Sequence, residues 1–539
     1  MSIKSKWDTF EFTDYLNVDK KEVKNLPNGI SISTMCASCK LNTRLNIPNI
    51  EKYLLLNPDD VLTVKKSKEV MRTLIAVKNK PKLQTIEKII ELVSLSKDSF
   101  IFESVEKVKI RGRYTIFGFN PDLVIETNNN RIIQSINNKK KIIKKNPYDY
   151  LNKLINNFRF KTSKKLPLMS AMLAGYFGYD IIRLKEKIPN KCKNDLKIPD
   201  VKLIRPQLIV IHDNEKNKIF FIQNIYNLKN IKNLKKLYLL KCDEINKFIA
   251  KINNTYNSTE YLNKNKKKNK IISNVTKKSF LNSISKAKEL INNGEIFQVV
   301  LSQRFETILN KTPINFYKKL RILNPSPFMF FFNFDNFKIA GSSPEILVRV
   351  RDNKITIRPI AGTRPRGRNF KEDNKFQKEL LNDKKEISEH LMLLDLGRND
   401  VGKVSKIGSV KVDQKFKIEK YSHVMHIVSN VVGDFDNKNS LLDTLFSGFP
   451  AGTVSGAPKI RAMEIIDDLE MSKRKLYAGG IGYFTPNNEM DTCIALRTAL
   501  IIDNKIYVQS GAGIVADSIP LNEYKETVNK AKALFEAAK

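Results

Sequence analysis

The chain has 539 residues, enough for two to four ordinary domains or one large enzyme body. It is 41% hydrophobic and 28% charged, a balance that excludes a largely disordered chain. No apolar run reaches the length of a membrane span, and the N-terminus lacks the apolar segment of a secretory signal. Five cysteines are too few, and odd in number, for a disulfide framework, so we expect a protein of the reducing cytoplasm.

The formal net charge of +39 raises the question of nucleic-acid binding. The lysines gather in segments such as 137–150 and 263–274, together with Asn and Ile. They are not interleaved with aromatic residues, as a surface that stacks on bases requires. We therefore keep nucleic-acid binding as an alternative of a different class. The positive field is expected mainly to favour an anionic small-molecule substrate.

The first part of the chain predicts secondary structure more clearly than it predicts chemistry. Residues 1–82 stay unassigned. Two strand-like runs lie between 99 and 126, and the apolar segment 168–184 predicts a packed helix. Residues 201–225 predict a β-hairpin whose turn lies at 214–217.

A stretch rich in Lys and Asn, 226–272, separates the two larger parts of the chain. Its composition predicts a helix and loop that act as a surface insertion or linker. We therefore divide the chain into the unassigned segment 1–82, an N-terminal region 83–225, this linker, and a C-terminal region 273–539.

The C-terminal region mixes helices and strands without a regular order. Residues 277–292 predict a helix, followed by a turn at Asn293-Gly294 and a strand. Four short strands follow, with turns predicted at Pro325, Asp335, Gly341 and Asn353. Helices at 383–400 and at the C-terminus flank further strand-like runs. Because βαβ alternation is lacking, we predict an α+β fold with large, mostly antiparallel sheets flanked by helices.

Two helices carry pairs of carboxylates at a spacing of three. Glu386 and Glu389 form one pair and Glu523 and Glu526 the other, so each pair projects from one helix face. Taken alone, either pair is better explained by a solvated helix surface. Together they could clamp a hard divalent cation such as Mg²⁺, which prefers oxygen ligands and keeps several waters.

Three glycine-rich turns add backbone N–H groups that favour a bound anion. They are Gly362-Thr363, Gly452-Thr453 and the run Gly511-Ala512-Gly513. Arg497 falls in an apolar, strand-like run, where an unpaired charge is costly, so its partner is either an internal acid or a substrate carboxylate. Glu345, at the start of a strand, suits a partly desolvated general acid. These residues indicate a Mg²⁺-dependent enzyme acting on a small polyanion.

An ordered series of motifs gives the chain a family resemblance. It includes PIAGTRPRG, KEISEHLMLLDLGRNDVGKV, YSHVMHIVSNVVG, GTVSGAPKIRAMEIID, YAGGIGYF, DTCIALRTAL, VQSGAGIVADS and EYKETVNKAKAL, and covers nearly everything from about 277 to 539. The chain thereby resembles the chorismate-utilising enzymes, and among them the aminase components (component I) of anthranilate synthases. Weaker similarity covers about 99 to 224. The resemblance implies the chorismate-utilising fold and a lyase of tryptophan biosynthesis.

The resemblance also implies roles for individual residues. In the family reaction, ammonia adds at C2 of chorismate with loss of the C4 hydroxyl, and pyruvate is then eliminated. Glu389 and Glu526 would bind Mg²⁺, with Glu386 and Glu523 supporting it through water. Glu345 matches the general acid, and His426 matches the residue implicated in pyruvate elimination. The positions that match chorismate contacts are Gly362, Thr363, Thr453, Tyr477, Arg497, Gly511, Ala512 and Gly513.

Two positions distinguish this chain from its relatives. Isochorismate and salicylate synthases carry a water-activating lysine where this sequence has Gln298, and Gln cannot act as that base. Aminodeoxychorismate synthases typically show PIKGT, whereas the lysine position is Ala361 here. Both positions favour anthranilate as the product. Aminodeoxychorismate synthesis remains the alternative within the family.

The resemblance further implies an inhibitory tryptophan site and a partner. The matching residues for tryptophan are Glu103, Ser104, Arg113, Asn324, Pro327, Phe328, Met329, Tyr483 and Cys493. No stretch of the chain reads as a glutaminase, which needs a nucleophilic cysteine paired with a histidine. Ammonia from glutamine would therefore come from a separate amidotransferase subunit in a hetero-oligomer.

Overall fold

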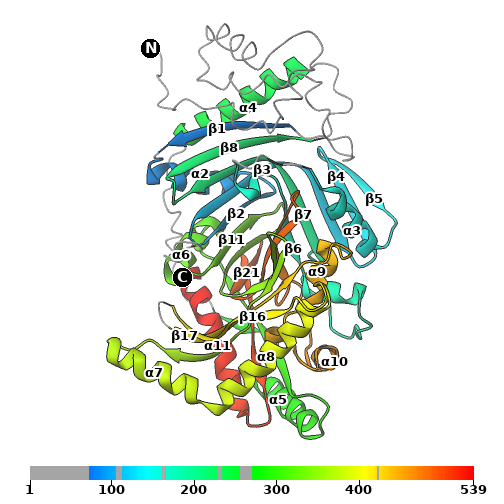
Figure 1. Cartoon of the computed structure of the whole chain (residues 1–539), viewed down its shortest axis with the longest axis vertical. Coiled ribbons are helices and arrows are strands. Elements are labelled where there is room, and N and C mark those ends of the chain that lie inside the picture. The colour runs from blue at the N-terminus through cyan, green and yellow to red at the C-terminus, as the bar shows by residue number, and fades with distance from the viewer. Residues whose placement is uncertain are drawn as a thin grey trace.

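The computed structural model describes residues 72–79, 81–104, 112–160, 162, 166–226, 234–254, 270–421 and 424–539. The unassigned segment 1–82 thus lies largely outside the described residues. The described strands join into one hydrogen-bonded network, and all pairings between named strands are antiparallel. Helices flank this network, and α5, α8, α10 and α11 gather at the end opposite α4 (Figure 1). The predicted α+β class is therefore confirmed.

The N-terminal region, with η marking 3₁₀ helices, contains β1 (Arg72–Asn79), α2 (Leu83–Leu95), β2 (Ser99–Glu103), β3 (Tyr114–Asn128), β4 (Arg131–Ile136), β5 (Lys139–Ile143), α3 (Pro147–Asn157), η4 (Leu168–Ser170), β6 (Leu173–Phe177), η5 (Tyr179–Leu184), β7 (Val201–Asp213), β8 (Lys218–Ile225) and α4 (Leu234–Asn254).

The C-terminal region contains β9 (Ile272–Ser273), α5 (Lys277–Asn292), β10 (Gln298–Ile308), α6 (Pro313–Leu323), β11 (Phe328–Asn333), β12 (Lys338–Ser343), β13 (Ile346–Arg351), β14 (Lys354–Ile357), β15 (Ile360–Pro365), α7 (Phe370–Asn382), α8 (Lys384–Gly402), β16 (Lys411–Lys420), β17 (Val424–Asp434), α9 (Leu441–Ser447), η7 (Gly452–Val454), β18 (Gly456–Ala457), α10 (Lys459–Leu469), β19 (Gly480–Thr485), β20 (Glu489–Ile494), β21 (Thr498–Ile502), β22 (Lys505–Ile514) and α11 (Pro520–Ala538).

The two larger parts of the chain share their strand ladders. β2 lies between β3 of its own region and β11 of the C-terminal region. In the same way β6 lies between β7 and β19. The predicted division into 83–225 and 273–539 therefore does not separate two independently folded bodies. Among the described residues, no helix is long and apolar enough to cross a membrane.

Helix α4 supplies the helix predicted within the insertion or linker at 226–272, and it packs against the core instead of standing free. Its side chains Cys242, Ile245 and Ile252 are buried in a hydrophobic cluster. Phe248 packs edge-on against Phe119, with ring centroids 4.8 Å apart. Lysines on the other helix face dominate the composition, so the apolar stripe at helical spacing was overlooked. The remainder of the predicted linker lies mostly outside the described residues.

The segment 168–184 is wrong as a predicted helix. It forms the short helix η4, the central strand β6 and the helix η5. Gly175 in β6 explains why: a Cβ at this position would lie 1.9 Å from the carbonyl oxygen of Lys202 on the neighbouring strand β7. A short apolar run cannot be assigned to helix or buried strand by periodicity alone.

The clearest periodic predictions are confirmed. The hairpin pairs Asp213 with Lys218 at its turn, and helices α5, α8 and α11 lie where they were predicted. Thr276 caps α5 by accepting a hydrogen bond from the amide of Ser279. Gly341 is not in a turn but inside β12, where the missing side chain leaves room for the ring of Phe330.

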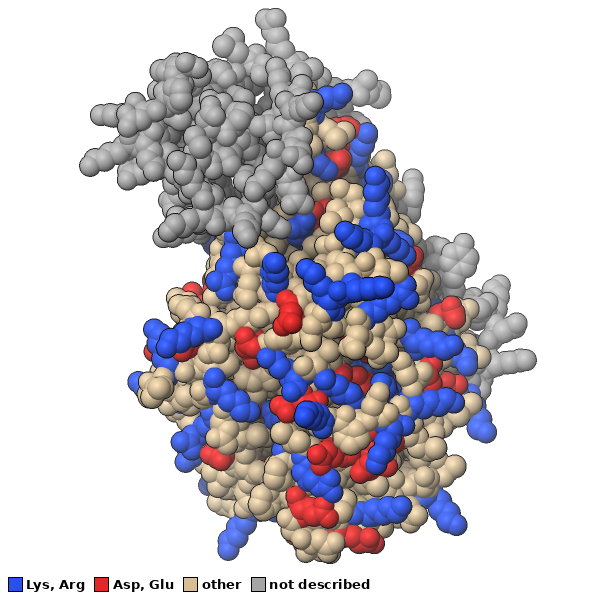
Figure 2. Space-filling model, turned by 90° about the vertical axis from the view of Figure 1, so that its right-hand side faces the viewer, with Lys and Arg blue, Asp and Glu red and all other residues tan. Residues whose placement is uncertain are grey.

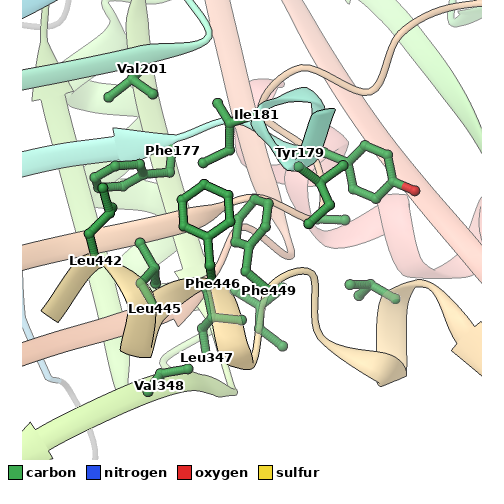
Figure 3. Packing of buried hydrophobic residues seen from close by; sticks show 14 of the residues in the cluster. Phe177, Tyr179, Ile181, Val201, Leu347, Val348, Leu442, Leu445, Phe446 and Phe449 are labelled. Carbon is green, nitrogen blue, oxygen red and sulfur yellow. The ribbon is translucent and has the colours of Figure 1, made fainter. Parts of the chain in front are cut away.

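The core packs directly behind the strand that begins after Glu345. Figure 3 shows Leu347 and Val348 of β13 facing α9, which contributes Leu445 and Phe446. The rings of Phe446 and Phe449 lie 5.9 Å apart. Such close packing fixes the start of β13 within narrow limits.

We expect Gly175→Ala to destabilise the fold. The added methyl would have to displace a backbone carbonyl, and overpacking of this kind costs about 1–3 kcal/mol or more. Gly402→Ala, at the end of α8 with open space around the new methyl, is the matched control and should be neutral or slightly stabilising. Denaturant unfolding measures both, and equal stabilities would contradict the close approach of β6 and β7.

Candidate active site

Glu345 is a buried acid held in the connection between β12 and β13. It is 7% exposed, and its Oε1 accepts a hydrogen bond from the Thr453 hydroxyl at 2.9 Å. Burial raises the pKa of Glu345 to about 7, although Thr453, Lys530 and Arg497 each act to lower it. A carboxyl group with this pKa can carry a proton near neutral pH and donate it to a leaving group.

Arg497 lies next to this acid. The sequence predicted it to be in a strand, but it lies in the connection between two strands. It connects β20 to β21 with φ at 47°, a left-handed conformation that is costly for a residue with a side chain. Burial lowers the pKa of Arg497, and the charge of Glu345 opposes this shift. Within the described part of the chain its guanidinium makes no ion pair. The half-buried cation is therefore available to an anionic ligand.

His426 on β17 is oriented by the turn on β15. Its Nδ1 lies 2.9 Å from the carbonyl oxygen of Gly362 and 3.1 Å from the hydroxyl of Thr363. Because a carbonyl can only accept, Nδ1 carries the hydrogen and Nε2 of the neutral ring is left as a base. Burial lowers the pKa of His426, which favours this neutral form.

Gly362 brings the histidine turn close to the carboxylates of α8. Its φ is +69°, and the β15–β17 ladder has an irregularity at this point. A Cβ on Gly362 would lie 3.1 Å from Oε2 of Glu386. Glu386 accepts a hydrogen bond from Arg364 at 3.0 Å, and Arg364 also binds Asp383 at 2.7 Å. The predicted catalytic turn and the predicted cation site are thus adjacent.

The carboxylates on α8 and α11 influence one another. Burial, followed by the charge of Glu386, raises the pKa of Glu389, and Glu526 adds to the effect. Burial and Glu526 likewise raise the pKa of Glu523. Gln298 lies 3.4 Å from Glu389, and Lys530 forms an ion pair with Glu526 at 2.6 Å.

These contacts bear on whether the four residues suit Mg²⁺. No cluster of three or more metal-ligating side chains is assembled among the described residues. Mg²⁺ nevertheless keeps several waters and often needs only one or two carboxylates. Mutual repulsion between these carboxylates, three of them half-buried and Glu526 exposed, is the electrostatic condition that a divalent cation relieves. The donor set of Glu386, Glu389, Glu523 and Glu526 therefore fits such an ion.

Strand β22 supplies the glycines of the site. Gly511 pairs with Ser302 and Gly513 with Val300 on β10. The carbonyl of Gly511 instead accepts a hydrogen bond from Lys530, so both glycines turn their backbone groups away from β10. Ala512 lies between them and has the opposite orientation, which corrects its prediction as an accessible amide. A Cβ on Gly511 would lie 2.7 Å from the Tyr477 hydroxyl.

The predicted tryptophan-contacting residues lie mainly on adjoining strands. Glu103 pairs with Met329, and its carboxyl group accepts a hydrogen bond from Tyr317 at 2.5 Å. Burial raises the pKa of Glu103 despite the nearby Arg321. Phe328 pairs with Ser343, next to Pro327 at the entry to β11.

The remaining predicted tryptophan-contacting residues differ in how directly they contact the strands around Glu103. Asn324 binds the hydroxyl of Ser342 at 3.2 Å, and buried Cys493 lies on β20. Tyr483 contacts the ring of Phe102 at 5.7 Å. Ser104 ends β2. Arg113 is less directly connected, because it forms ion pairs with Asp213 at 3.0 Å and Glu215 at 3.2 Å.

Sequence reasoning missed three cations that shape the site, and it missed the contact of Gln298, a position it used only to distinguish the nucleophile. Arg364 holds Glu386, Lys530 holds Glu526, and Gln298 contacts Glu389. Arg474 is fully buried behind the glycine turns. Only Lys530 had a signal, since it follows Glu526 by four residues on one helix.

Comparison with known proteins finds relatives over most of the chain. A family model described as chorismate binding enzyme matches residues 97–536. Anthranilate synthase component 1 of Cereibacter sphaeroides is 45% identical over 455 residues, covering 84% of this chain and 91% of that protein. The protein of the same name from Acetivibrio thermocellus is 45% identical over 444 residues, covering 81% and 89%.

Solved structures show the same relationship. The crystal structure of anthranilate synthase component I from Streptococcus pneumoniae matches with a TM-score of 0.70 and 35% identity, covering 80% of this chain and 93% of that one. The menaquinone-specific isochorismate synthase MenF of Escherichia coli matches with a TM-score of 0.65 over 88% and 96% of the two chains. At 17% identity it shares the fold alone.

The burial of Glu345 predicts a pH-dependent stability difference. Its pKa of about 7 lies above the ordinary 4.5, so between these values the folded state binds more protons and stability falls as pH rises. Glu345→Gln lacks this loss. The unfolding free energy of the variant minus that of the wild type should therefore increase by about 3 kcal/mol between pH 4 and pH 8.

Denaturant unfolding at several pH values checks this expectation. Glu379→Gln, an exposed position on α7, is the control and should show no such trend. A Glu345→Gln difference that stays constant with pH would contradict the desolvated acid.

Proposed function

This chain belongs to the family of chorismate binding enzymes, and from that premise we propose that it converts chorismate and ammonia to anthranilate, pyruvate and water. The relatives named anthranilate synthase component 1 support this product. Gln298 supports it because Gln cannot activate water, so ammonia is the nucleophile. The single observation that carries the proposal is the buried acid Glu345 beside the cation Arg497, which makes no ion pair with any residue that the structure describes.

In the first step ammonia forms a bond to C2 while the C4 oxygen leaves. Glu345 gives its proton to that oxygen, which departs as water, and the double bonds of the ring shift accordingly. The Thr453 hydroxyl stabilises the carboxylate that Glu345 becomes, since it donates to Oε1. Arg497 holds a substrate carboxylate beside the acid and keeps the C4 oxygen within its reach.

In the second step the proton at C2 is removed and the C3–O bond breaks. Nε2 of His426 is the base, because Nδ1 is held by Gly362 and Thr363. The released enol becomes pyruvate, and the ring becomes aromatic. The turn at Gly362 thus sets both the tautomer and the direction of the base.

Glu389 and Glu526 would hold Mg²⁺, with Glu386 and Glu523 acting through water. When bound, the ion supplies positive charge to the ring carboxylate of the substrate. The raised pKa values of Glu389 and Glu523 favour a cation at this place. Arg364 pairs with Glu386 and Lys530 pairs with Glu526, so two of the four carboxylates are already oriented.

From the same family membership we infer three further properties of this activity. A separate glutaminase subunit supplies ammonia, and tryptophan inhibits through the site around Glu103. Cys192, Cys242 and Cys493 are free thiols, which suits the cytoplasm. Nucleic-acid binding has less support, since Figure 2 shows Lys and Arg spread over the visible face with acidic residues among them.

An assay for fluorescent anthranilate tests the proposal. Purified chain with chorismate, Mg²⁺ and ammonium should form the product. Glu389→Gln should lower the rate at least about 100-fold, because loss of a direct metal ligand should cost no less than the largest effect typical of losing an outer-shell partner. Asp395→Asn, an exposed carboxylate on the same helix, is the control. Chorismate consumed without release of pyruvate would instead identify the aminodeoxychorismate branch.

Removal of the metal should have a pH-dependent effect. Mg²⁺ binding must displace protons from carboxyl groups whose pKa is raised, so affinity should fall as pH decreases through the acidic range. Thermal unfolding with Mg²⁺ or a chelator measures this as a shift in Tm. A Tm shift that is equal in the wild type and Glu389→Gln would contradict the assigned ligands.

A further inference from the structure

Among the residues that the structure describes, Arg474 is the largest fully buried side chain, and it lies shortly after helix α10. Its Nη1 donates to the carbonyl of Val454 at 2.7 Å, and its Nη2 donates to the carbonyl of Val300 at 2.6 Å. Its Nε and Nη2 also bind the carboxylate of Glu470 at 3.0 and 2.5 Å. The guanidinium therefore joins its own segment to the turn at Val454 and to strand β10, where Val300 lies 174 positions away in the sequence.

Each of these segments carries part of the proposed substrate pocket. Val454 directly follows Thr453, which binds the acid Glu345. Val300 pairs with Gly513 across the β10–β22 ladder. The guanidinium also lies 5.4 Å from the ring centroid of Tyr477, whose hydroxyl approaches Gly511.

Glu470 extends the same network into β10. Its Oε1 accepts hydrogen bonds from the Ser302 amide at 2.8 Å and the Ser302 hydroxyl at 2.7 Å. Gln509 of β22 donates to that hydroxyl at 2.8 Å. The acid thus ties the end of α10 to β10 and, through the Ser302 hydroxyl, to β22, the strand that supplies the glycines.

We propose that Arg474, oriented by Glu470, is a positioning residue that holds Thr453, Tyr477 and the β22 glycines in register around the substrate. Only a planar guanidinium can donate to two carbonyls and a carboxylate in fixed directions, whereas a lysine ammonium is a compact charge on a flexible stem. The inference rests on the proposed function for the identity of the substrate.

A purely structural role is the competing explanation, and the chain contains a matched example. Arg205 of β7 binds Asp122 of β3 through Nε at 2.9 Å and Nη2 at 2.7 Å. Its guanidinium lies 4.2 Å from the ring centroid of Tyr226. Those strands carry none of the predicted substrate-contacting residues, so Arg205→Lys is a suitable control.

The hydrogen bond between Thr453 and Glu345 separates the two explanations. Thr453, Lys530 and Arg497 are the groups that lower the pKa of Glu345 against its burial. If Arg474 fixes the turn at Thr453, its replacement weakens that bond and raises the pKa of Glu345 further. A structural role elsewhere would lower stability without moving this pKa.

The test compares Arg474→Lys, Glu470→Gln and Thr453→Val with Arg205→Lys in the full chain. For anthranilate formation we expect kcat/KM to fall about 100-fold in Arg474→Lys, the cost of a misplacement of about 1 Å. The falling limb of its pH profile should move to higher pH, as in Thr453→Val. Combining Arg474→Lys with Thr453→Val should move it no further. Arg205→Lys should leave the limb unchanged.

A second readout needs no substrate. The pH dependence of the unfolding free energy reports Glu345 directly, so the window of falling stability should extend to higher pH in Arg474→Lys and in Glu470→Gln. Both properties unchanged relative to wild type would overturn the proposal. If Arg474→Lys does not fold, Glu470→Gln decides it alone. A wild type that forms no anthranilate would overturn the proposed function, while the unfolding data would still decide the role of Arg474.

Discussion

The site depends on backbone hydrogen bonds at two connections between strands, the β12–β13 connection that contains Glu345 and the β20–β21 connection that contains Arg497. The amide of Ile494 donates to the carbonyl of Glu345, and the amide of Ser342 donates to the carbonyl of Arg497, both at 3.1 Å. The acid and the cation therefore lie side by side although they are 152 positions apart by subtraction of their numbers. These bonds also support the left-handed backbone of Arg497, which would otherwise be costly.

Around this pair the structure keeps its charges separate. Arg497 has no ion-pair partner in the described chain, and Glu345 has only the hydroxyl of Thr453 as a hydrogen-bond donor to its carboxylate. At the other end of the site, acidic residues on α8 and α11 repel one another while Arg364 and Lys530 orient them. In the proposed reaction a substrate with two carboxylates would place one at Arg497 and the other near the acidic residues, where a bound Mg²⁺ would supply positive charge.

The sequence predicted long elements and failed on short ones. Helices α5, α8 and α11 were found because their apolar residues follow the helical period over four or five turns. Strand β6 was mistaken for a helix because a short apolar run has no diagnostic period. Gly341 was taken for a turn, although its role is to admit the Phe330 ring. In both cases a glycine allows close approach of a residue on a neighbouring strand, which a local pattern does not reveal.

The same limit applies to the site. Glycine-rich turns and Glu pairs could be recognised locally, and the family resemblance assigned their roles. The contact between Gln298 and Glu389 joins positions 91 apart, and the reach of Arg474 to Val300 spans 174. No local pattern encodes these distances. They follow only once the antiparallel ladders bring β10, β18 and β22 together.

The titration of the Glu345 carboxyl group tests the central claim most directly. ¹³C NMR of the chain labelled at Glu side chains, compared with Glu345→Gln, isolates this one resonance. The account predicts a midpoint near pH 7, because burial raises the pKa of Glu345 to about 7. A midpoint near the ordinary 4.5 would show a solvated carboxylate that holds no proton at neutral pH, and would contradict its role as the acid.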